Sequence, residues 1–582
     1  MAAESESMAV TVARGREAPA WSLADPIAKL NQICKAIALG VVITIGATAL
    51  YFQFYSARFT GLIGRAGIDQ AQLAAHIARG EGMTTDVVTP LGLRLVPSVA
   101  SHPDLMSAPL YPHALAVAFR LRHVSDGVVA VSNGLIYLLT VWALYVLAKV
   151  LYGKPAAILT AVLYATSIEA LDRGLRGGPV SLAGLMLTLT FLALFLVIRR
   201  EWTGPDASAR GEQRGRSTSL WRWVGVVGAA VLLAITYLCD CVSLLLVVPL
   251  AAALWFGLRS RKTTAAIVFL VVAVACLAPW FYRNYQCTRT LLPALQTREL
   301  VSRTQAYPGT AVFREASDAV PDPVEFAIAH PAQMAVKVVT GFTRMYRQLP
   351  LFISIYLFPF VVVGAFWAKR SRETRVLWRA AIAVGVIQLL AACLYDLDVT
   401  SVLVLAPVAT CLGTGAFVEL MSATVRSRSA RAWLTALLIA VCAFPYAASI
   451  SLAGKEPPHP SYANLAWLRL ARYPEGHPAA GHLVIPADAV IATNVPHAVA
   501  WYTRRTAVWL PPDEEGLQNL QANGAPIDYV YLSRAGMGDP QQEEPPDRWT
   551  AMLLRPNLNE ITKLGSPMPL PGPELLIALK KP

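Results

Sequence analysis

Long apolar runs with few charged residues recur through the first three quarters of the sequence. A helix needs about 20 such residues to cross the ~30 Å hydrocarbon core of a bilayer. About eleven runs reach or approach this length: 36–55, 127–148, 155–170, 180–198, 224–238, 242–258, 263–281, 351–368, 376–395, 399–418 and 433–452. A mean hydropathy of +0.47 and a charged fraction of 15% exclude a cytosolic enzyme. We therefore expect a polytopic α-helical membrane protein.

The distribution of charge orients these spans. The net charge is +13, yet residues 452–582 carry 11 Lys and Arg against 13 Asp and Glu. The excess of positive charge therefore lies in the short connectors, and every second connector is basic. By the positive-inside rule these connectors face the cytoplasm, so the N-terminus is expected inside and the C-terminus outside. This pattern indicates a bacterial inner (plasma) membrane protein whose partners include membrane lipids, and it argues against nucleic acid.

Three domains follow from this topology. Residues 1–35 form a cytoplasmic tail, 36–452 a membrane domain with long outer loops 56–126 and 282–350, and 453–582 an outer domain. In the last segment, strand-like runs at 483–485, 489–492, 507–510 and 529–532 alternate with helical stretches such as 515–523. We expect a small α/β domain with a parallel or mixed sheet.

The first outer loop contains the segment that most suggests chemistry. Residues 67–82 predict a short helix, in which Leu73 and Ile77 share a face. Asp69 stands where an N-cap is expected, with Gln72 three residues later as in a capping box. Asp69 is therefore either a helix cap or a reactive carboxylate. Because the spans contain almost no ionisable groups, we expect any chemistry at the outer face.

Three motifs follow one another along the outer segments of the chain. The first is Asp69 with the helix that follows it, then Pro-Leu-Tyr-Pro at 109–112 before the short apolar helix 113–121. The second is Pro-Trp-Phe-Tyr-Arg-Asn at 279–284, where a span leaves the membrane. The third is Ile-Ala-Thr-Asn-Val-Pro at 491–496, with 500–505 and 508–511. In this order the motifs resemble the C-type membrane glycosyltransferases, closest to the family 39 type that includes protein O-mannosyltransferases and aminoarabinose transferases.

The resemblance implies transfer of a sugar from a polyprenyl-phosphate carrier to an acceptor glycan, lipid or protein, with Asp69 as the catalytic base. A carboxylate can take the proton from an acceptor hydroxyl as it attacks the anomeric carbon. Cationic groups near the outer membrane surface would stabilise the leaving phosphate. The candidates are Arg65, Arg176, Arg283, Arg344, Tyr346 and Arg347. Two alternatives stay open: Arg283 as a snorkelling anchor, and the stretch 331–349 as a basic interfacial helix.

The sequence departs from the family pattern at two acidic positions. Gln70 follows Asp69 where many members have Glu, and Gly178 stands where many have a carboxylate. Asp172 is a candidate second acid from one turn earlier. No cofactor is expected: no nucleotide-binding loop is present, and no metal-binding motif supports a divalent ion.

We therefore predict an inverting glycosyltransferase at the outer face of the membrane. One alternative is a multi-span transporter of lipid or sugar, although such proteins usually place polar groups at the bilayer midplane. The other is a non-catalytic relative that binds glycolipid, which the changes at Gln70 and Gly178 favour.

Overall fold

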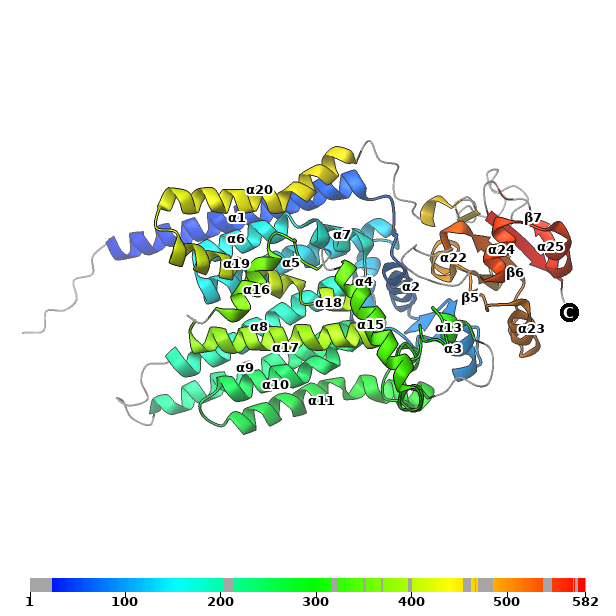
Figure 1. Ribbon diagram of the computed structural model, residues 1–582, viewed down its shortest axis with the longest axis horizontal. Coiled ribbons are helices and arrows are strands. Elements are labelled where there is room, and N and C mark those ends of the chain that lie inside the picture. Colours follow the sequence, from blue (N-terminus) through cyan, green and yellow to red (C-terminus); the bar gives the residue numbers. More distant parts are fainter. Residues whose placement is uncertain are drawn as a thin grey trace, which may run out of the picture.

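The computed structural model consists of a long helical bundle with a small α/β domain at one end (Figure 1). It describes residues 24–203, 213–315, 322–348, 352–367, 370–395, 400–453, 462–465, 467–468, 485–536, 547–568, 570 and 574–580. Most of the expected cytoplasmic tail, residues 1–23, lies outside these ranges.

The bundle is made of long apolar helices joined by short ones. The helices before the second outer loop are α1 (Ala24–Arg58), α2 (Arg65–Arg79), α3 (Pro90–Leu95), α4 (Leu110–Leu121), α5 (Asp126–Tyr152), α6 (Lys154–Ala165), α7 (Ile168–Arg176), α8 (Val180–Thr203), α9 (Gln213–Cys239), the 3-10 helix η1 (Cys241–Leu246), α10 (Val247–Gly257) and α11 (Lys262–Thr288). Those that follow are α12 (Ala294–Arg298), α13 (Ala311–Arg314), α14 (Pro323–Ala329), α15 (Pro331–Gln348), α16 (Phe358–Phe366), α17 (Arg372–Tyr395), α18 (Thr400–Leu403), α19 (Ala406–Thr424) and α20 (Arg428–Leu452).

Eight of the helices in the described residues are long and apolar enough to cross a membrane. They confirm a polytopic helical membrane fold and coincide with eight of the eleven predicted runs. The other three runs contain shorter helices. The run 155–170 is interrupted after α6, where Ser167 caps α7 by accepting a hydrogen bond from the Ala170 amide, and 242–258 begins as η1 before α10. Of the run 351–368, only α16 is a helix among the described residues. The number of spans and the sides of the termini stay predictions.

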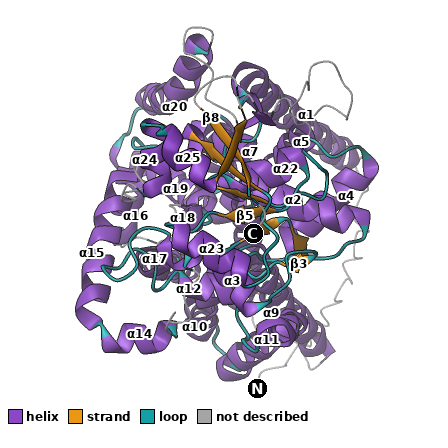
Figure 2. Ribbon diagram, turned by 90° about the vertical axis from the view of Figure 1, so that its right-hand side faces the viewer, coloured by secondary structure: helices purple, strands orange, loops and turns teal. Residues whose placement is uncertain are grey.

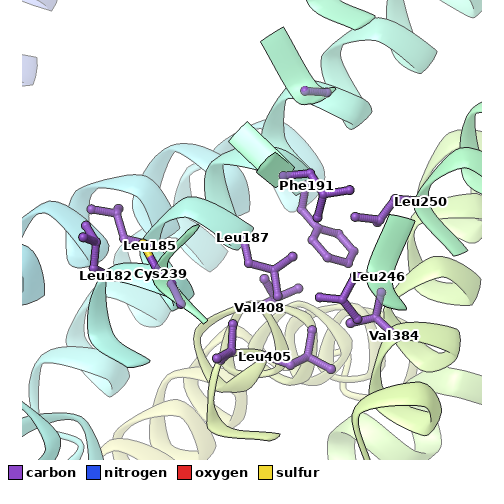
Figure 3. Packing of buried hydrophobic residues seen from close by; sticks show 14 of the residues in the cluster. Leu182, Leu185, Leu187, Phe191, Cys239, Leu246, Leu250, Val384, Leu405 and Val408 are labelled. Atoms are coloured by element: carbon purple, nitrogen blue, oxygen red, sulfur yellow. The ribbon is translucent and has the colours of Figure 1, made fainter. Parts of the chain in front are cut away.

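The core of the bundle is a continuous apolar cluster between α8, α9, α10, α17 and α19. Figure 3 shows Leu187 and Phe191 of α8 meeting Leu246 of η1 and Val408 of α19 in this cluster. Leu187, Phe191, Leu246 and Val408 are fully buried. Within a membrane such side chains stabilise the bundle through close packing, because lipid tails are as apolar as leucine and burial there gains little from the hydrophobic effect.

The basic connectors meet at the end of the bundle away from the α/β domain. The guanidinium groups of Arg259 and Arg372 lie 3.5 and 4.3 Å from the ring centre of Trp202. Arg370 forms an ion pair with Glu419 at 2.8 Å. Their common location is what the charge pattern predicted, because connectors on one side of a membrane lie at one end of a bundle.

The α/β domain contains a six-stranded mixed sheet with the order β2-β5-β4-β6-β8-β7. Its strands are β2 (Val87–Val88), β4 (Ile491–Thr493), β5 (Ala507–Trp509), β6 (Tyr529–Ser533), β7 (Gly565–Met568) and β8 (Glu574–Leu579); β1 (Thr84–Thr85) and β3 (His102–Pro103) form a separate pair. Its helices are η3 (Tyr462–Asn464), α22 (Pro496–Thr503), α23 (Glu514–Ala522), η4 (Arg534–Gly536), α24 (Arg548–Leu554) and α25 (Leu558–Leu564).

The predicted strands at 489–492, 507–510 and 529–532 match β4, β5 and β6, whereas the run 483–485 lies mostly outside the described residues. One edge strand comes from elsewhere in the chain. Val87 and Val88 of the first outer loop pair in parallel with Ala507 and Val508. Figure 2 shows the sheet lying over the end of the bundle, with α2 and α22 beside it. The first outer loop and the C-terminal domain therefore fold as one unit.

Candidate active site

Helix α2 carries Asp69 in its second turn. The helix begins at Arg65, with Gly64 as an extended N-cap that makes no side-chain cap bond. Of the two readings of Asp69, the helix cap is therefore wrong. The physical reason is a close contact: a Cβ on Gly67 would lie 2.1 Å from the carbonyl oxygen of Arg176. Glycine there lets the first turn of α2 lie directly on the end of α7, which extends the helix beyond the predicted start.

Two basic side chains contact the Asp69 carboxylate. Nδ1 of His497 lies 2.6 Å from Oδ1, and Nε of Arg65 lies 3.9 Å from Oδ2. The Arg65 guanidinium also lies 4.2 Å from the ring centre of Trp509 at the end of β5. The Asp69 side chain keeps 26% of its surface exposed. The carboxylate is thus held on one side and open on the other.

The open side of Asp69 faces a cavity of about 310 Å³. Its charged and titratable lining groups are Arg65, Asp69, His102, Asp104, Cys239, Asp240, Cys241, Glu299, Arg303 and His497. Burial raises the pKa of the Asp104 carboxyl, although Arg283 and the Ser107 amide oppose this rise. Burial also raises the pKa of Asp240 to about 6. The cavity is therefore lined by four acids, of which Asp104 is buried and Asp69, Asp240 and Glu299 are partly exposed.

His497 is buried on α22. Burial lowers its pKa, and the repulsion from Arg65 adds to this while Asp69 opposes it. A carboxylate can only accept hydrogen bonds, so Nδ1 of His497 must donate to Asp69. His497 was not among the predicted site residues. It lies 428 positions from Asp69, and the only local signal was its place directly after the 491–496 motif.

The two acidic positions that depart from the family pattern have local explanations. Gly178 has φ +98°, a backbone conformation that favours glycine. Gln70 is 7% exposed and lines the cavity, and its Oε1 has no hydrogen-bond partner among the described residues. A side-chain carbonyl at that position can accept a hydrogen bond from a bound hydroxyl group.

Asp172 and Arg176 form an ion pair on α7, with Oδ2 and Nε 2.6 Å apart. Both side chains are about half exposed, at 46% and 53%. Arg176 lies beside the first turn of α2, next to Gly64 and Gly67, but neither Arg176 nor Asp172 lines the Asp69 cavity. The structure thus places Arg176 close to the helix of Asp69 without bringing either residue against the carboxylate.

Arg283, in the predicted motif at the end of α11, joins two backbone segments of the first outer loop by hydrogen bonds. Its Nη1 donates to the carbonyl oxygen of Asp104 at 2.7 Å, and its Nη2 to that of Met83 at 3.4 Å. Its guanidinium lies 5.0 Å from the ring centre of Trp280. Arg283 therefore braces the loop that lines the cavity.

Arg344, Tyr346 and Arg347 lie on α15, which matches the predicted amphipathic stretch. None of the three lines the Asp69 cavity, and Tyr346 is 71% exposed. Lys337 on the same helix donates to the carbonyl oxygens of Glu299 and Leu300 at 2.5 and 3.1 Å. The helix is thereby joined to the loop that forms one wall of the cavity.

Within the described ranges, no group of three or more His, Cys, Asp and Glu side chains is arranged to hold a metal ion. His76, seven residues after Asp69, is engaged elsewhere: its Nε2 lies 2.9 Å from Oδ2 of Asp86, and its Nδ1 2.9 Å from Oγ1 of Thr84.

A comparison with protein families finds a match for one segment of the chain. A family model described as dolichyl-phosphate-mannose-protein mannosyltransferase matches residues 101–204, which run from β3 to α8. Together with the fold, this match confirms the resemblance to the C-type glycosyltransferases and indicates a glycosyltransferase. No curated protein sequence gives a significant match.

Solved structures share this fold at low sequence identity. The apo oligosaccharyltransferase of Archaeoglobus fulgidus has a TM-score of 0.55 and 13% identity over 85% of this chain and 69% of its own. ArnT from Cupriavidus metallidurans bound to undecaprenyl phosphate has a TM-score of 0.53 and 15% identity over 93% and 98%. AglB from Archaeoglobus fulgidus, in complex with an inhibitory peptide and a dolichol-phosphate, has a TM-score of 0.53 and 13% identity over 84% and 69%. These likenesses concern the fold.

Proposed function

We propose that this protein transfers a sugar from a polyprenyl-phosphate carrier to an acceptor at the outer face of a bacterial inner membrane. The observation that carries the proposal is the Asp69 carboxylate, held by His497 and Arg65 at the edge of a 310 Å³ cavity at one end of the bundle. The carriers in two structures of the same fold, undecaprenyl phosphate and dolichol-phosphate, support this donor class.

The reaction is a single displacement. Asp69 takes the proton from the acceptor hydroxyl while that oxygen forms a bond to the anomeric carbon of the sugar. The bond from the same carbon to the phosphate oxygen breaks, and its electron pair leaves with the carrier phosphate. Because attack and departure occur on opposite faces, the anomeric configuration inverts. The acceptor is a glycan, a lipid or a protein hydroxyl group.

The leaving phosphate gains negative charge, which arginine side chains stabilise. Arg65 lines the cavity, and Arg176 lies beside the start of the same helix. We propose these two as the groups nearest the phosphate at the moment of transfer. Arg344, Tyr346 and Arg347 on α15, a helix with a strongly apolar face, would hold the carrier at the membrane surface, and Arg283 would act by bracing the cavity wall. Asp172, which forms an ion pair with Arg176, would be the second acid of the site.

The test uses the full chain in lipid nanodiscs with undecaprenyl-phosphate mannose, glucose and aminoarabinose as separate donors. The release of undecaprenyl phosphate is the measured product. Removing a general base typically costs about 10²–10⁴ in rate, so Asp69→Asn should lower kcat by that factor while binding of undecaprenyl phosphate is retained. The matched control is Asp488→Asn, the same change in an exposed carboxylate of the C-terminal domain that does not line the cavity. Transfer by Asp69→Asn at the wild-type rate would remove Asp69 from catalysis.

A further inference from the structure

His497 comes from the C-terminal domain and yet forms part of the Asp69 site. Among the described residues that line the cavity, it is the only one that follows residue 310. All the other lining residues belong to the membrane domain or its outer loops. The cavity is therefore incomplete without the C-terminal domain.

The contact between His497 and Asp69 is short and its direction is defined. The 2.6 Å separation of Nδ1 and Oδ1 is that of a charge-assisted hydrogen bond. A carboxylate offers no proton, so the imidazole proton lies on Nδ1. Burial lowers the pKa of His497, while the Asp69 carboxylate opposes this shift.

Helix α22, which carries His497, is fixed at both ends. At its start, the Val495 amide donates to Oγ1 of Thr493 at 3.1 Å, and Pro496 supplies a preformed first turn. At its end, Nε1 of Trp501 and the hydroxyl of Tyr502 donate to the Asp126 carboxylate at 2.7 and 2.8 Å. His497 therefore reaches Asp69 from a rigid support.

We propose that His497 is a positioning residue for the general base. Its Nδ1 proton holds Oδ1 of Asp69, which leaves Oδ2, 3.9 Å from Nε of Arg65, to receive the acceptor proton. This inference rests on the proposed function. It assigns to the C-terminal domain a part in catalysis: the domain fixes the rotamer of a carboxylate that lies on another domain.

The test compares His497→Ala with His497→Asn. The Asn side chain has its amide nitrogen on Cγ, as the imidazole has Nδ1, so it can donate from the same place. In the nanodisc assay we expect His497→Ala to lower kcat about 10- to 100-fold, as when other orienting partners are lost, with the donor KM unchanged. His497→Asn should restore most of kcat. The control is His113→Ala, an exposed histidine on α4.

A second measurement needs no turnover. A water-soluble carbodiimide labels accessible carboxyl groups, and mass spectrometry gives the rate at which it labels Asp69. This rate should rise severalfold in His497→Ala and return to the wild-type value in His497→Asn. Equal labelling of all three proteins would overturn the proposal. The two hypotheses also fail separately in the assay. Full activity of His497→Ala with an inactive Asp69→Asn overturns only the positioning role, whereas no release of undecaprenyl phosphate by the wild type from any of the three donors overturns the proposed function.

Discussion

Replacing Gly67 with Ala tests whether the contact between α2 and α7 sets the position of Asp69. The added Cβ would lie 2.1 Å from the Arg176 carbonyl oxygen and 3.3 Å from the carbonyl carbon of Gly177. A carbon and a carbonyl oxygen approach to about 3.3 Å in folded proteins. The start of α2 must therefore move by roughly 1 Å, because the obstacle is backbone and cannot rotate away.

Two consequences follow from this displacement. Overpacking of this kind costs about 1–3 kcal/mol, and the better helix propensity of Ala returns about 0.5–1 kcal/mol. The net loss of stability should be about 0.5–2 kcal/mol. Asp69 lies two residues further along the same helix and would move with it. A misplacement of about 1 Å can cost about 10²-fold in rate, so we expect a large fall in kcat from a modest loss of stability.

The assay pairs kcat in nanodiscs with thermal unfolding of the same preparation. The matched control is Gly46→Ala in α1, a helical glycine with no atom within 4 Å of the added Cβ. The control should keep its kcat and gain slightly in Tm. If Gly67→Ala has the same Tm and the same kcat as the wild type, the close contact does not position the carboxylate and the reasoning fails.

Two further predictions concern the acids around the site. Burial raises the pKa of Asp240 from 3.8 to about 6. The Asp240 carboxyl therefore keeps its proton to a higher pH in the folded state than in the unfolded state. As the pH rises between these two values, the free energy of unfolding falls by about 3 kcal/mol in total. Asp240→Asn should therefore raise Tm at pH 7.5 and leave it nearly unchanged below pH 4; an equal shift at both values would contradict this. Asp126→Ala leaves the indole N–H of Trp501 and the hydroxyl of Tyr502 without this charged acceptor, which costs about 1.5–3 kcal/mol per bond. In Asp126→Ala we expect the backbone amides of α22 to exchange hydrogen faster than in the wild type, while those of α8 exchange at the wild-type rate. Wild-type exchange rates in α22 would refute the role of this contact.

The sequence was sufficient for the features that depend on local patterns. Apolar runs of about 20 residues located the long helices, and the alternation of strand and helix signals located β4, β5, β6 and α23. The helix around Asp69 was also predictable, because Leu73 and Ile77 repeat at helical spacing. The predicted first residue of this helix was wrong. A capping box is a local signal, whereas the actual start depends on the contact of Gly67 with Arg176, which lies more than 100 residues later.

The contacts that complete the site could not be predicted from local patterns. Strand β2 has two residues, Val87 and Val88, which is too short for a periodic signal, and its partner strand lies 420 positions later. His497 sits in an apolar helix with nothing nearby in the sequence to suggest a carboxylate partner. Both contacts depend on how the C-terminal domain docks onto the first outer loop, and that is a property of the whole fold.

The acid missing at position 178, one of two that the sequence offered as a reason to doubt activity, has a structural explanation. Gly178 adopts a φ of +98° beside the start of α2, where a carboxylate side chain would be strained. Two other carboxyl groups, those of Asp104 and Asp240, line the cavity from separate segments. The absence of an acid at position 178 therefore follows from the close approach of α7 to α2, and the cavity still contains acidic groups. Gly178 therefore does not by itself favour a weakened or non-catalytic relative.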